Sequence, residues 1–327
     1  MAVPTSASHN IPILSDVPTE KLRVDVGQSL WSIAFRRFRR DYLSIAALIT
    51  LLVIVVACYG APVVAQILNI DPNQPSSLTY APPGVEGHIL GTDDLGRDQF
   101  VRLLNGGQIS LAIGFFAGVL ALTIGVGLGV LTGYRGGIID DILNWFITTL
   151  DSLPQLYLLL LVTVVVRASL TSQAQNQSIL ASVPPAVLLV CILSLLGWTG
   201  TMRLVRGETF SLREREYVLA ARAVGASDVR IMFTHILPNV LSVILITLMI
   251  GIGELILIES TLSFLGFGIQ LPTSTWGNML TKAQEYYKLG PHLIFAPGIL
   301  ITITVLCLFI LGDGLRDAFD PKLKEKA

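Results

Sequence analysis

Three carboxylates crowd a short polar stretch of the chain, where they could bind a metal ion. The stretch contains Asp93, Asp94, Gly96, Arg97 and Asp98. Calcium prefers such oxygen ligands, but the spacing does not match an EF-hand loop and no glutamate follows at its last position. A turn in which Thr92 caps a short helix accounts for the same residues, because Asp93 and Asp94 would lie beside the positive end of the helix dipole. The sequence therefore favours a turn over a metal site.

A second polar segment, residues 203–238, has the pattern of two short helices joined by a glycine turn. Its Ser-Leu-Arg-Glu sequence from Ser211 has the spacing of a capping box, which predicts the start of a helix. Gly225 can supply the positive φ that ends this helix, and Ser227 can cap the next one. Because proline cannot continue a helix from its amide side, we expect the second helix to end before Pro238.

The first of these two helices carries small residues that another backbone can approach closely, the Ala220-Ala221 pair after Leu219. Charged side chains flank the pair and could make polar contacts around it: Arg213, Arg215, Glu216 and Arg222. An ordinary amphipathic helix that rests on lipid headgroups would use the same basic residues. The residues by themselves support a docking helix and an interfacial helix about equally.

Two more carboxylates, Glu254 and Glu259, lie inside an otherwise apolar run, where a charge is costly and usually functional. One hypothesis is a proton relay through a membrane, and the other is a structural role fixed by hydrogen bonds. We expect the structural role for Glu254, although this residue could also face a cavity. Glu259 is expected to fix the end of its helix.

The remaining chemistry-bearing residues form no metal-ligand or catalytic motif. The four histidines show no ligand spacing, and the three cysteines all lie in apolar runs. The sequence also lacks a phosphate-binding Gly-x-x-x-x-Gly-Lys-Ser/Thr loop, a His-Glu-x-x-His motif and a Gly-x-Ser-x-Gly elbow. The chain is therefore expected to bind neither a metal nor ATP, to catalyse no reaction, and to take its energy from a partner.

The composition indicates which elements must position these groups. The 327 residues are 52% hydrophobic and only 14% charged, with a mean hydropathy of +0.69. Soluble domains contain about 25% charged residues, so this chain is expected to be dissolved in lipid. With 22 basic and 23 acidic residues, the net charge of −1 offers no basic surplus for binding nucleic acid.

Six apolar runs are each long enough to cross a bilayer as a helix, which takes roughly 20 residues. They cover residues 42–70, 108–134, 142–166, 179–202, 239–267 and 293–312. The polar segments around them are 1–41, 71–107, 203–238 and 313–327. The sequence thus predicts an all-α membrane protein with six transmembrane helices, in which residues 100–315 form one domain and the first span stands apart.

Glycines within the second run predict how its helix packs. Gly125, Gly129 and Gly133 recur at every fourth position and so share one helix face. Because small residues at this spacing let two helices cross closely, we expect packing against another helix rather than solute binding.

The distribution of Lys and Arg predicts the orientation of the spans, since basic residues are enriched in cytoplasmic loops. With the amino terminus inside, 17 of the 22 basic residues fall on the cytoplasmic side and 5 fall outside. Both termini and the 203–238 segment are therefore expected in the cytoplasm, and the 71–107 segment outside.

The 203–238 segment resembles the EAA loop of the membrane subunits of binding-protein-dependent ABC importers. That pattern is Glu-Ala-Ala, three residues, Gly, nine residues and Ile-x-Leu-Pro. The positions that match it in register are Ala220, Ala221, Gly225, Leu237 and Pro238. Leu219 replaces the glutamate and His235 replaces the isoleucine, although Glu216 lies one turn before Leu219 on the same helix face.

Three further stretches resemble the C-type subunit of the dipeptide, oligopeptide and nickel permeases. These stretches are 88–98, 216–223 and 259–268, the last followed by Pro272 and Trp276-Gly277. The resemblance implies the type I ABC importer permease fold in the plasma membrane of a prokaryote. It also implies that the permease domain is the part identified above as 100–315.

The resemblance further implies a set of partners. A homologous second permease would complete a solute path, and two cytoplasmic ATPase subunits would bind ATP and Mg²⁺ below it. A substrate-binding protein would dock outside, where residues 93–98 are expected to face a partner. Residues 212–225 would form the coupling helix that enters a cleft on one ATPase and transmits its movement to the spans.

The solute is expected to be a di- or oligopeptide, with nickel or an oligosaccharide as alternatives in the same architecture. An ion-coupled secondary carrier would use Glu254 or Glu259 for protons, but it predicts a repeat between the two halves that the sequence does not display. A membrane scaffold without a transport path would leave the EAA-like loop unexplained.

Overall fold

The computed structural model describes residues 30–174 and 183–319. Within these ranges the regular elements are helices, and the β-type pairing is a single isolated bridge between Thr92 and Asp98. Predictions that fall on residues 1–29 of the amino-terminal segment, 179–182 of the fourth apolar run and 320–327 of the tail lie outside the described residues.

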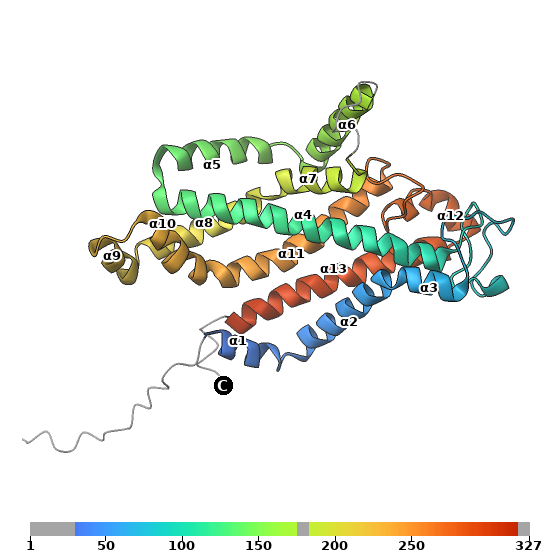
Figure 1. Ribbon diagram of the computed structural model, residues 1–327, viewed down its shortest axis with the longest axis horizontal. Coiled ribbons are helices and arrows are strands. Elements are labelled where there is room, and N and C mark those ends of the chain that lie inside the picture. Colours follow the sequence, from blue (N-terminus) through green and yellow to red (C-terminus); the bar gives the residue numbers. More distant parts are fainter. Residues whose placement is uncertain (1–29, 175–182, 320–327) are drawn as a thin grey trace, which may run out of the picture.

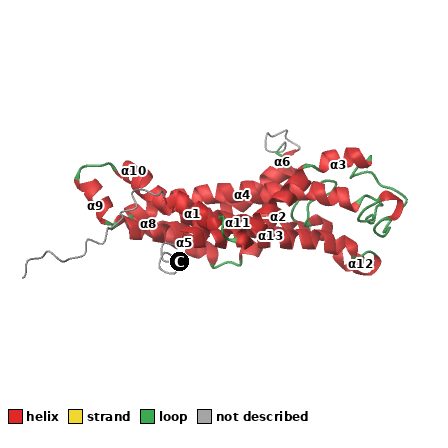
Figure 2. Ribbon diagram, turned by 90° about the horizontal axis from the view of Figure 1, so that it is seen from below, coloured by secondary structure: helices red, strands yellow, loops and turns green. Residues whose placement is uncertain are grey.

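The helices lie mostly along one common axis (Figure 1). In chain order they are α1 (Leu30–Phe38), α2 (Tyr42–Tyr59), α3 (Ala61–Leu68), α4 (Gln99–Arg135), α5 (Gly137–Asp151), α6 (Gln155–Ala174), α7 (Pro185–Gly197), α8 (Thr199–Arg213), α9 (Glu216–Ala223), α10 (Asp228–Ile231), α11 (Leu237–Phe264), α12 (Ala283–Leu289) and α13 (His292–Phe319). The bundle is elongated, with α9 and α10 at one end and α12 at the other (Figure 2).

Four of the described helical segments are long and apolar enough to cross a membrane, and two bent helix pairs raise the number of candidate spans to six. The pair α5 and α6, which contains the run 142–166 predicted as one span, is bent by 91°. Pro154 supplies the reason, since it lacks an amide proton and disfavours helical geometry in the preceding residue. The pair α7 and α8 bends by a milder 41° and takes the place of the run 179–202.

Helix α4 begins earlier than the sequence predicts, because nine residues assigned to the 71–107 loop are helical. Asp98 caps the helix by accepting a hydrogen bond from the amide of Val101 at 2.7 Å. Arg102, which lies within the segment predicted as a loop, is only 2% exposed and lies 3.4 Å from Asp93. Because Asp93 neutralises the charge of Arg102, α4 can include this arginine.

The centre of the bundle is the contact between α4 and α8, and glycines make it possible. A Cβ atom added to Gly125, Gly129 or Gly133 would lie within 2.8 Å of the carbonyl oxygen of Trp198, Met202 or Arg206, respectively. The two backbones therefore approach as closely as the glycine spacing predicts, and the expected packing role is confirmed.

The helix boundaries around the 203–238 segment differ from the prediction at two points. Ser211 belongs to the last turn of α8, and the next helix starts at Glu216 after Arg215, so the predicted capping box does not exist. Pro238 does not end a helix either, because α10 continues through a π-helical turn at Met232–Ile236 directly into α11. A proline in the first turn of a helix has no amide partner to lose, which explains why it is tolerated there.

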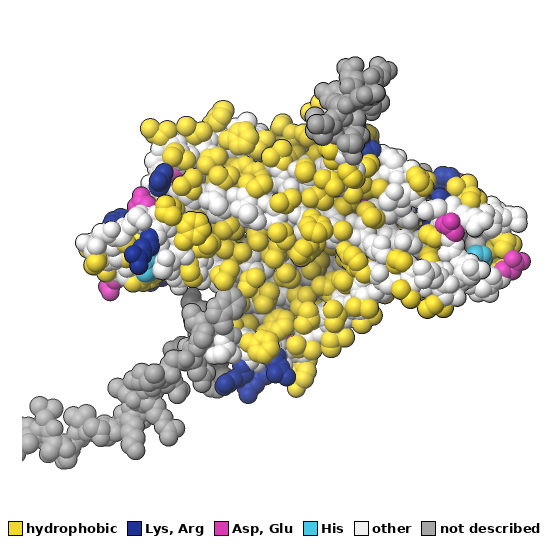
Figure 3. All heavy atoms as spheres, viewed as in Figure 1, with side chains coloured by type: hydrophobic (Ala, Val, Ile, Leu, Met, Phe, Trp, Pro, Cys, Tyr) yellow, Lys and Arg dark blue, Asp and Glu magenta, His cyan; other side chains and the backbone are white. Residues whose placement is uncertain are grey.

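The surface agrees with a bilayer environment. Hydrophobic side chains cover the middle of the face drawn in Figure 3, and most charged side chains on that face gather toward the ends of the bundle and beside its lower edge. Many large apolar side chains of α2, α5 and α6 are exposed, among them Leu52, Val56, Trp145, Tyr157 and Leu161. A chain with this belt and several apolar helices is a multi-pass membrane protein.

Candidate functional site

The loop between α8 and α11 forms one end of the molecule, beyond the ends of the long helices (Figure 1). Its first helix, α9, ends at a turn in which Gly225 has a φ of +87°, as the sequence predicts. The hydroxyl of Ser227 then accepts a hydrogen bond from the amide of Arg230 at 3.4 Å and caps α10, which is also as predicted. A residue with a side chain would be strained at Gly225, since positive φ is costly for all residues but glycine.

This loop is fixed on the bundle by one apolar anchor and two polar contacts. The side chain of Val218 is fully buried in a cluster with Ile231 and Tyr134, which brings α9, α10 and α4 together. The Tyr134 hydroxyl donates a hydrogen bond to the Asp228 carboxylate at 3.0 Å, and the Arg222 guanidinium lies 5.4 Å from the centre of the Tyr134 ring. The loop is therefore attached directly to the end of α4.

The rest of the α9 surface is largely exposed, although the ring of Tyr217 lies 6.4 Å from that of His235. Large apolar side chains project from α9 and from the residues that follow: Tyr217, Leu219, Val224, Val229 and Phe233. Val224, beside the glycine turn, is 90% exposed. An exposed apolar group of this kind at the tip of a loop indicates a protein contact.

The residues predicted to act together in this loop are distributed differently from the expectation. Ala220 is exposed, whereas Ala221 packs inward against the Val218 cluster, so the two alanines do not form one docking surface. Arg213 lies at the end of α8 and donates a hydrogen bond to the carbonyl oxygen of Gly133 at 3.2 Å. Glu216, Leu219 and Arg222 do lie on α9, where all three are exposed.

At the other end of the molecule, the carboxylates of the 93–98 stretch are all engaged with protein groups. Asp93 accepts hydrogen bonds from the amides of Leu95 and Arg97 at 2.9 and 3.0 Å, and from the Arg97 side chain at 2.8 Å. Asp98 caps α4 and also contacts the His88 ring nitrogen at 2.7 Å. The helix predicted after Thr92 does not form, because these bonds close a turn instead.

Asp94 ties this turn to a distant part of the chain. It accepts hydrogen bonds from the Tyr286 hydroxyl, at 3.0 Å, and from Lys282. Although burial alone would raise the pKa of Asp94, the bonds from Lys282 and Tyr286 hold it below the usual range. Nothing in the sequence could identify Lys282 and Tyr286 as partners, since they lie nearly two hundred positions away.

Glu259 is fully buried at the junction of three elements. Its carboxylate accepts hydrogen bonds from Ser110 of α4 at 2.9 Å and from Ser263 of α11 at 2.7 Å. The Ser110 hydroxyl in turn accepts a bond from the backbone amide of Trp276 at 3.2 Å. This geometry fits the structural role expected for Glu259, because the carboxylate joins two spans to the loop that precedes α12.

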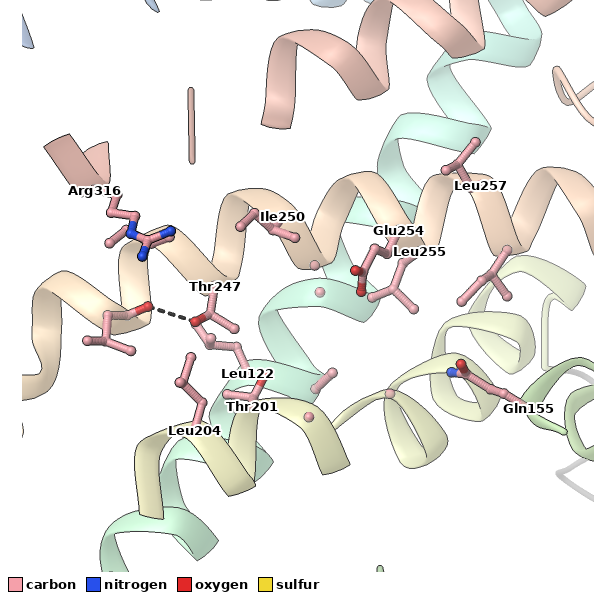
Figure 4. Close-up of a pocket in the computed structure, with 18 of the residues that line it drawn as sticks. Leu122, Gln155, Thr201, Leu204, Thr247, Ile250, Glu254, Leu255, Leu257 and Arg316 are labelled. Carbon is pink, nitrogen blue, oxygen red and sulfur yellow. Dashed lines mark hydrogen bonds between the residues drawn. The ribbon is translucent and has the colours of Figure 1, made fainter. Parts of the chain in front are cut away.

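Glu254 lies in a different environment, at the wall of a cavity of about 860 Å³ (Figure 4). The cavity is lined by α4, α7, α8 and α11, together with Gln155 of α6 and Arg316 of α13. Within the described part of the chain, the Glu254 carboxylate has neither a hydrogen bond nor an ion pair. Its carboxylate points into the cavity, which is the second expectation stated for this residue, and no hydrogen bond among the described residues supports the structural role.

The described residues contain no group of three or more His, Cys, Asp or Glu side chains that could hold a metal ion. What the arrangement offers instead is a cavity between membrane helices, a buried polar joint at Glu259 and an exposed apolar loop at one end. This combination fits a membrane subunit that surrounds part of a solute path and contacts another protein. Comparison with known proteins identifies the family.

Residues 125–325 match the family described as the inner membrane component of binding-protein-dependent transport systems. The chain belongs to this family. Residues 29–83 match the N-terminal transmembrane domain of oligopeptide transport permease C, so the resemblance drawn from the motifs is confirmed. The chain is thus a permease-type membrane subunit. Membership in this family implies a non-catalytic membrane component, as the sequence predicts.

The curated relatives cover almost the whole chain. The oligopeptide permease OppC of Bacillus subtilis is 35% identical over 91% of each protein, and OppC of Escherichia coli K12 is 36% identical over 93% of this chain and 95% of its own length. The dipeptide permease DppC of Alkalihalophilus pseudofirmus is 35% identical over 97% of this chain and 98% of its own length.

A solved structure supports the fold. A chain of the inward-facing MetNI methionine ABC transporter superposes with a TM-score of 0.51 and 20% sequence identity, covering 66% of this chain and 96% of that chain. The prediction of an all-α ABC importer permease fold is therefore confirmed.

Proposed function

We propose that this chain is one of two permease subunits of an ATP-driven importer for di- or oligopeptides. Family membership and relatives named as oligopeptide and dipeptide permeases support this assignment. A homologous second permease would close the open side of the cavity that Glu254 borders. A substrate-binding protein would deliver the peptide, and alternating exposure of the cavity would carry it across the membrane.

The observation that carries the proposal is the exposed apolar tip of the 216–231 loop. Tyr217, Leu219 and Val224 project from a short helix that is anchored to α4 through Val218. An apolar tip on a firmly held element can transmit a push or a pull from a partner, and an ATPase subunit is the partner that the family implies. ATP and Mg²⁺ would be held by that partner and its second copy.

The orientation follows from the same assignment. The α9 end and both chain termini would face the cytoplasm, in agreement with the excess of basic residues predicted there. The 93–98 turn and α12 would then face the outside of a prokaryotic plasma membrane. Because Lys282 and Tyr286 fix that turn through Asp94, it would offer the binding protein a rigid surface.

The first test is purification of the tagged chain from its native membrane in a mild detergent, with co-purifying proteins identified by mass spectrometry. Recovery of two ATPase chains and a homologous permease is the expected result. The variant Val224→Asp places a charge at the loop tip and should reduce recovery of the ATPase chains. Recovery of the second permease is the internal control and should not change. A chain that purifies alone and transports without ATPases would overturn the proposal.

A further inference from the structure

The cavity that Glu254 borders has a mostly apolar wall with few ionisable side chains. Most of its wall consists of apolar and small residues, such as Gly118, Gly197, Gly200 and Leu255. Its volume of about 860 Å³ lies within the range of small-molecule sites. Among the described residues that line the cavity, the ionisable ones are Glu208, Glu254 and Arg316.

Packing between α11 and α13 places Arg316 far from Glu254. A Cβ atom on Gly312 would lie 3.0 Å from Ile250, and one on Gly253 would lie 3.0 Å from Phe309, so the two helices run antiparallel in a defined register. Arg316, one turn beyond Gly312, is therefore roughly 12 Å from the level of Glu254 along α11, at 1.5 Å per residue. Figure 4 shows the two side chains at different ends of the cavity.

No other basic side chain of the adjoining wall compensates Glu254. A second hollow continues past Gln155 and Glu254 to Asp151. The arginine beside that hollow, Arg203, forms an ion pair with Asp151 at 2.6 Å and is thus already neutralised. Glu254 is thus left in a largely apolar cavity without an ion pair to any of the described residues.

A carboxylate in the membrane interior is costly unless it is paired or serves a ligand. Gln155 of α6, which lines the same cavity, adds a neutral hydrogen-bonding group to its wall. We infer that Glu254 is a specificity-determining residue that pairs with a cationic nitrogen of the passing solute, an ammonium or guanidinium group.

This inference rests on the proposed function, since it names the chemical class that the solute path accepts. In a peptide, the cationic nitrogen has two possible sources, the terminal ammonium group and the side chain of Lys or Arg. An extended tripeptide spans roughly 10 Å, which is comparable to the separation between Glu254 and Arg316.

The test uses the complete importer in proteoliposomes with its binding protein and measures uptake at saturating peptide. The peptides are Ala-Lys-Ala, Ala-Ala-Ala and Ala-Glu-Ala, and the variants are Glu254→Gln and Glu254→Asp. Glu254→Gln should lower uptake of Ala-Lys-Ala about tenfold, since the amide oxygen of Gln still accepts a hydrogen bond from the ammonium group but lacks the negative charge that strengthens it. Glu254→Asp keeps the charge and should stay close to the wild-type rates.

The pattern of losses distinguishes the two sources. A loss confined to Ala-Lys-Ala, with faster uptake of Ala-Glu-Ala, assigns the contact to a cationic side chain. If Glu254→Gln lowers uptake of all three peptides equally while Glu254→Asp keeps the wild-type rates, the contact is assigned to the terminal ammonium group. Equal losses in both variants, or no loss in either, would overturn the inference.

Asp141→Asn is the matched control, because Asp141 is an exposed carboxylate of α5 that does not line the cavity. This variant should keep the wild-type ratio of Ala-Lys-Ala to Ala-Glu-Ala uptake. Failure of the proposed function is a separate result: the wild-type importer would then transport none of the three peptides.

Discussion

At the scale of single residues, Glu254 and Glu259 demonstrate that two carboxylates five positions apart on one helix can have opposite environments. Glu259 is fully buried and accepts bonds from Ser110 and Ser263, whereas Glu254 is exposed to a cavity. Five positions along a helix correspond to a rotation of about 140°, since each turn takes about 3.6 residues. One carboxylate therefore faces the neighbouring helices and the other faces the cavity.

Replacement of Glu259 by Ala is expected to destabilise the fold by about 3 kcal/mol, because it leaves the buried hydroxyls of Ser110 and Ser263 without their acceptor. Glu259→Gln keeps one acceptor oxygen and should cost less, about 1 kcal/mol. The measurement is the thermal unfolding midpoint of the purified complex, together with the amount of protein in the membrane. Equal midpoints for Glu259→Ala and the wild type would contradict the structural role.

At the scale of elements, the contact between α4 and α8 decides whether the bundle can form. Gly129→Ala would place a Cβ atom 2.8 Å from the carbonyl oxygen of Met202 and 2.9 Å from the side chain of Val205. We expect a loss of stability of about 1–3 kcal/mol from this overpacking. Gly127→Ala is the matched control, since a Cβ atom there would meet nothing within 4 Å. The same unfolding midpoint for both variants would argue against the close helix contact.

The turn between α9 and α10 is the second element whose geometry can be tested. Gly225→Val should strain the backbone by about 1–2 kcal/mol at a φ of +87°, without any clash, because no atom lies within 4 Å of the added Cβ. On the proposed coupling role, ATP hydrolysis would continue while peptide uptake falls. Asparagine adopts the left-handed conformation more readily than valine, so Gly225→Asn should lower peptide uptake less. Normal uptake per ATP hydrolysed by Gly225→Val would speak against coupling through this turn.

At the scale of the whole molecule, the two ends of the bundle are expected on opposite sides of the membrane. Tyr217 and Glu86 are exposed near these two ends. A cysteine at position 217 should react with a membrane-impermeant maleimide only in inside-out vesicles, and a cysteine at position 86 only in right-side-out vesicles. The wild-type chain is the control, because Cys58 and Cys307 are buried and Cys191 lies within an apolar helix. Labelling of both positions from one side would refute the predicted topology.

The sequence by itself determined the class of the protein, the number of apolar runs, the glycine turn and the family. These features depend on local order, namely apolar stretches of span length, the positive φ of Gly225 and the spacing of Gly125, Gly129 and Gly133. Composition and short motifs determine them because neighbours in the chain are also neighbours in a helix.

Only the tertiary structure decided where α4 begins and what the charged groups do. The start of α4 depends on the burial of Arg102 beside Asp93, a contact between the helix and the loop that precedes it. Asp94 finds its partners Lys282 and Tyr286 across the bundle, and Glu254 finds none in the described chain. Such pairings arise because folding brings distant segments together, and burial then makes an unpaired charge matter far more than it does in water.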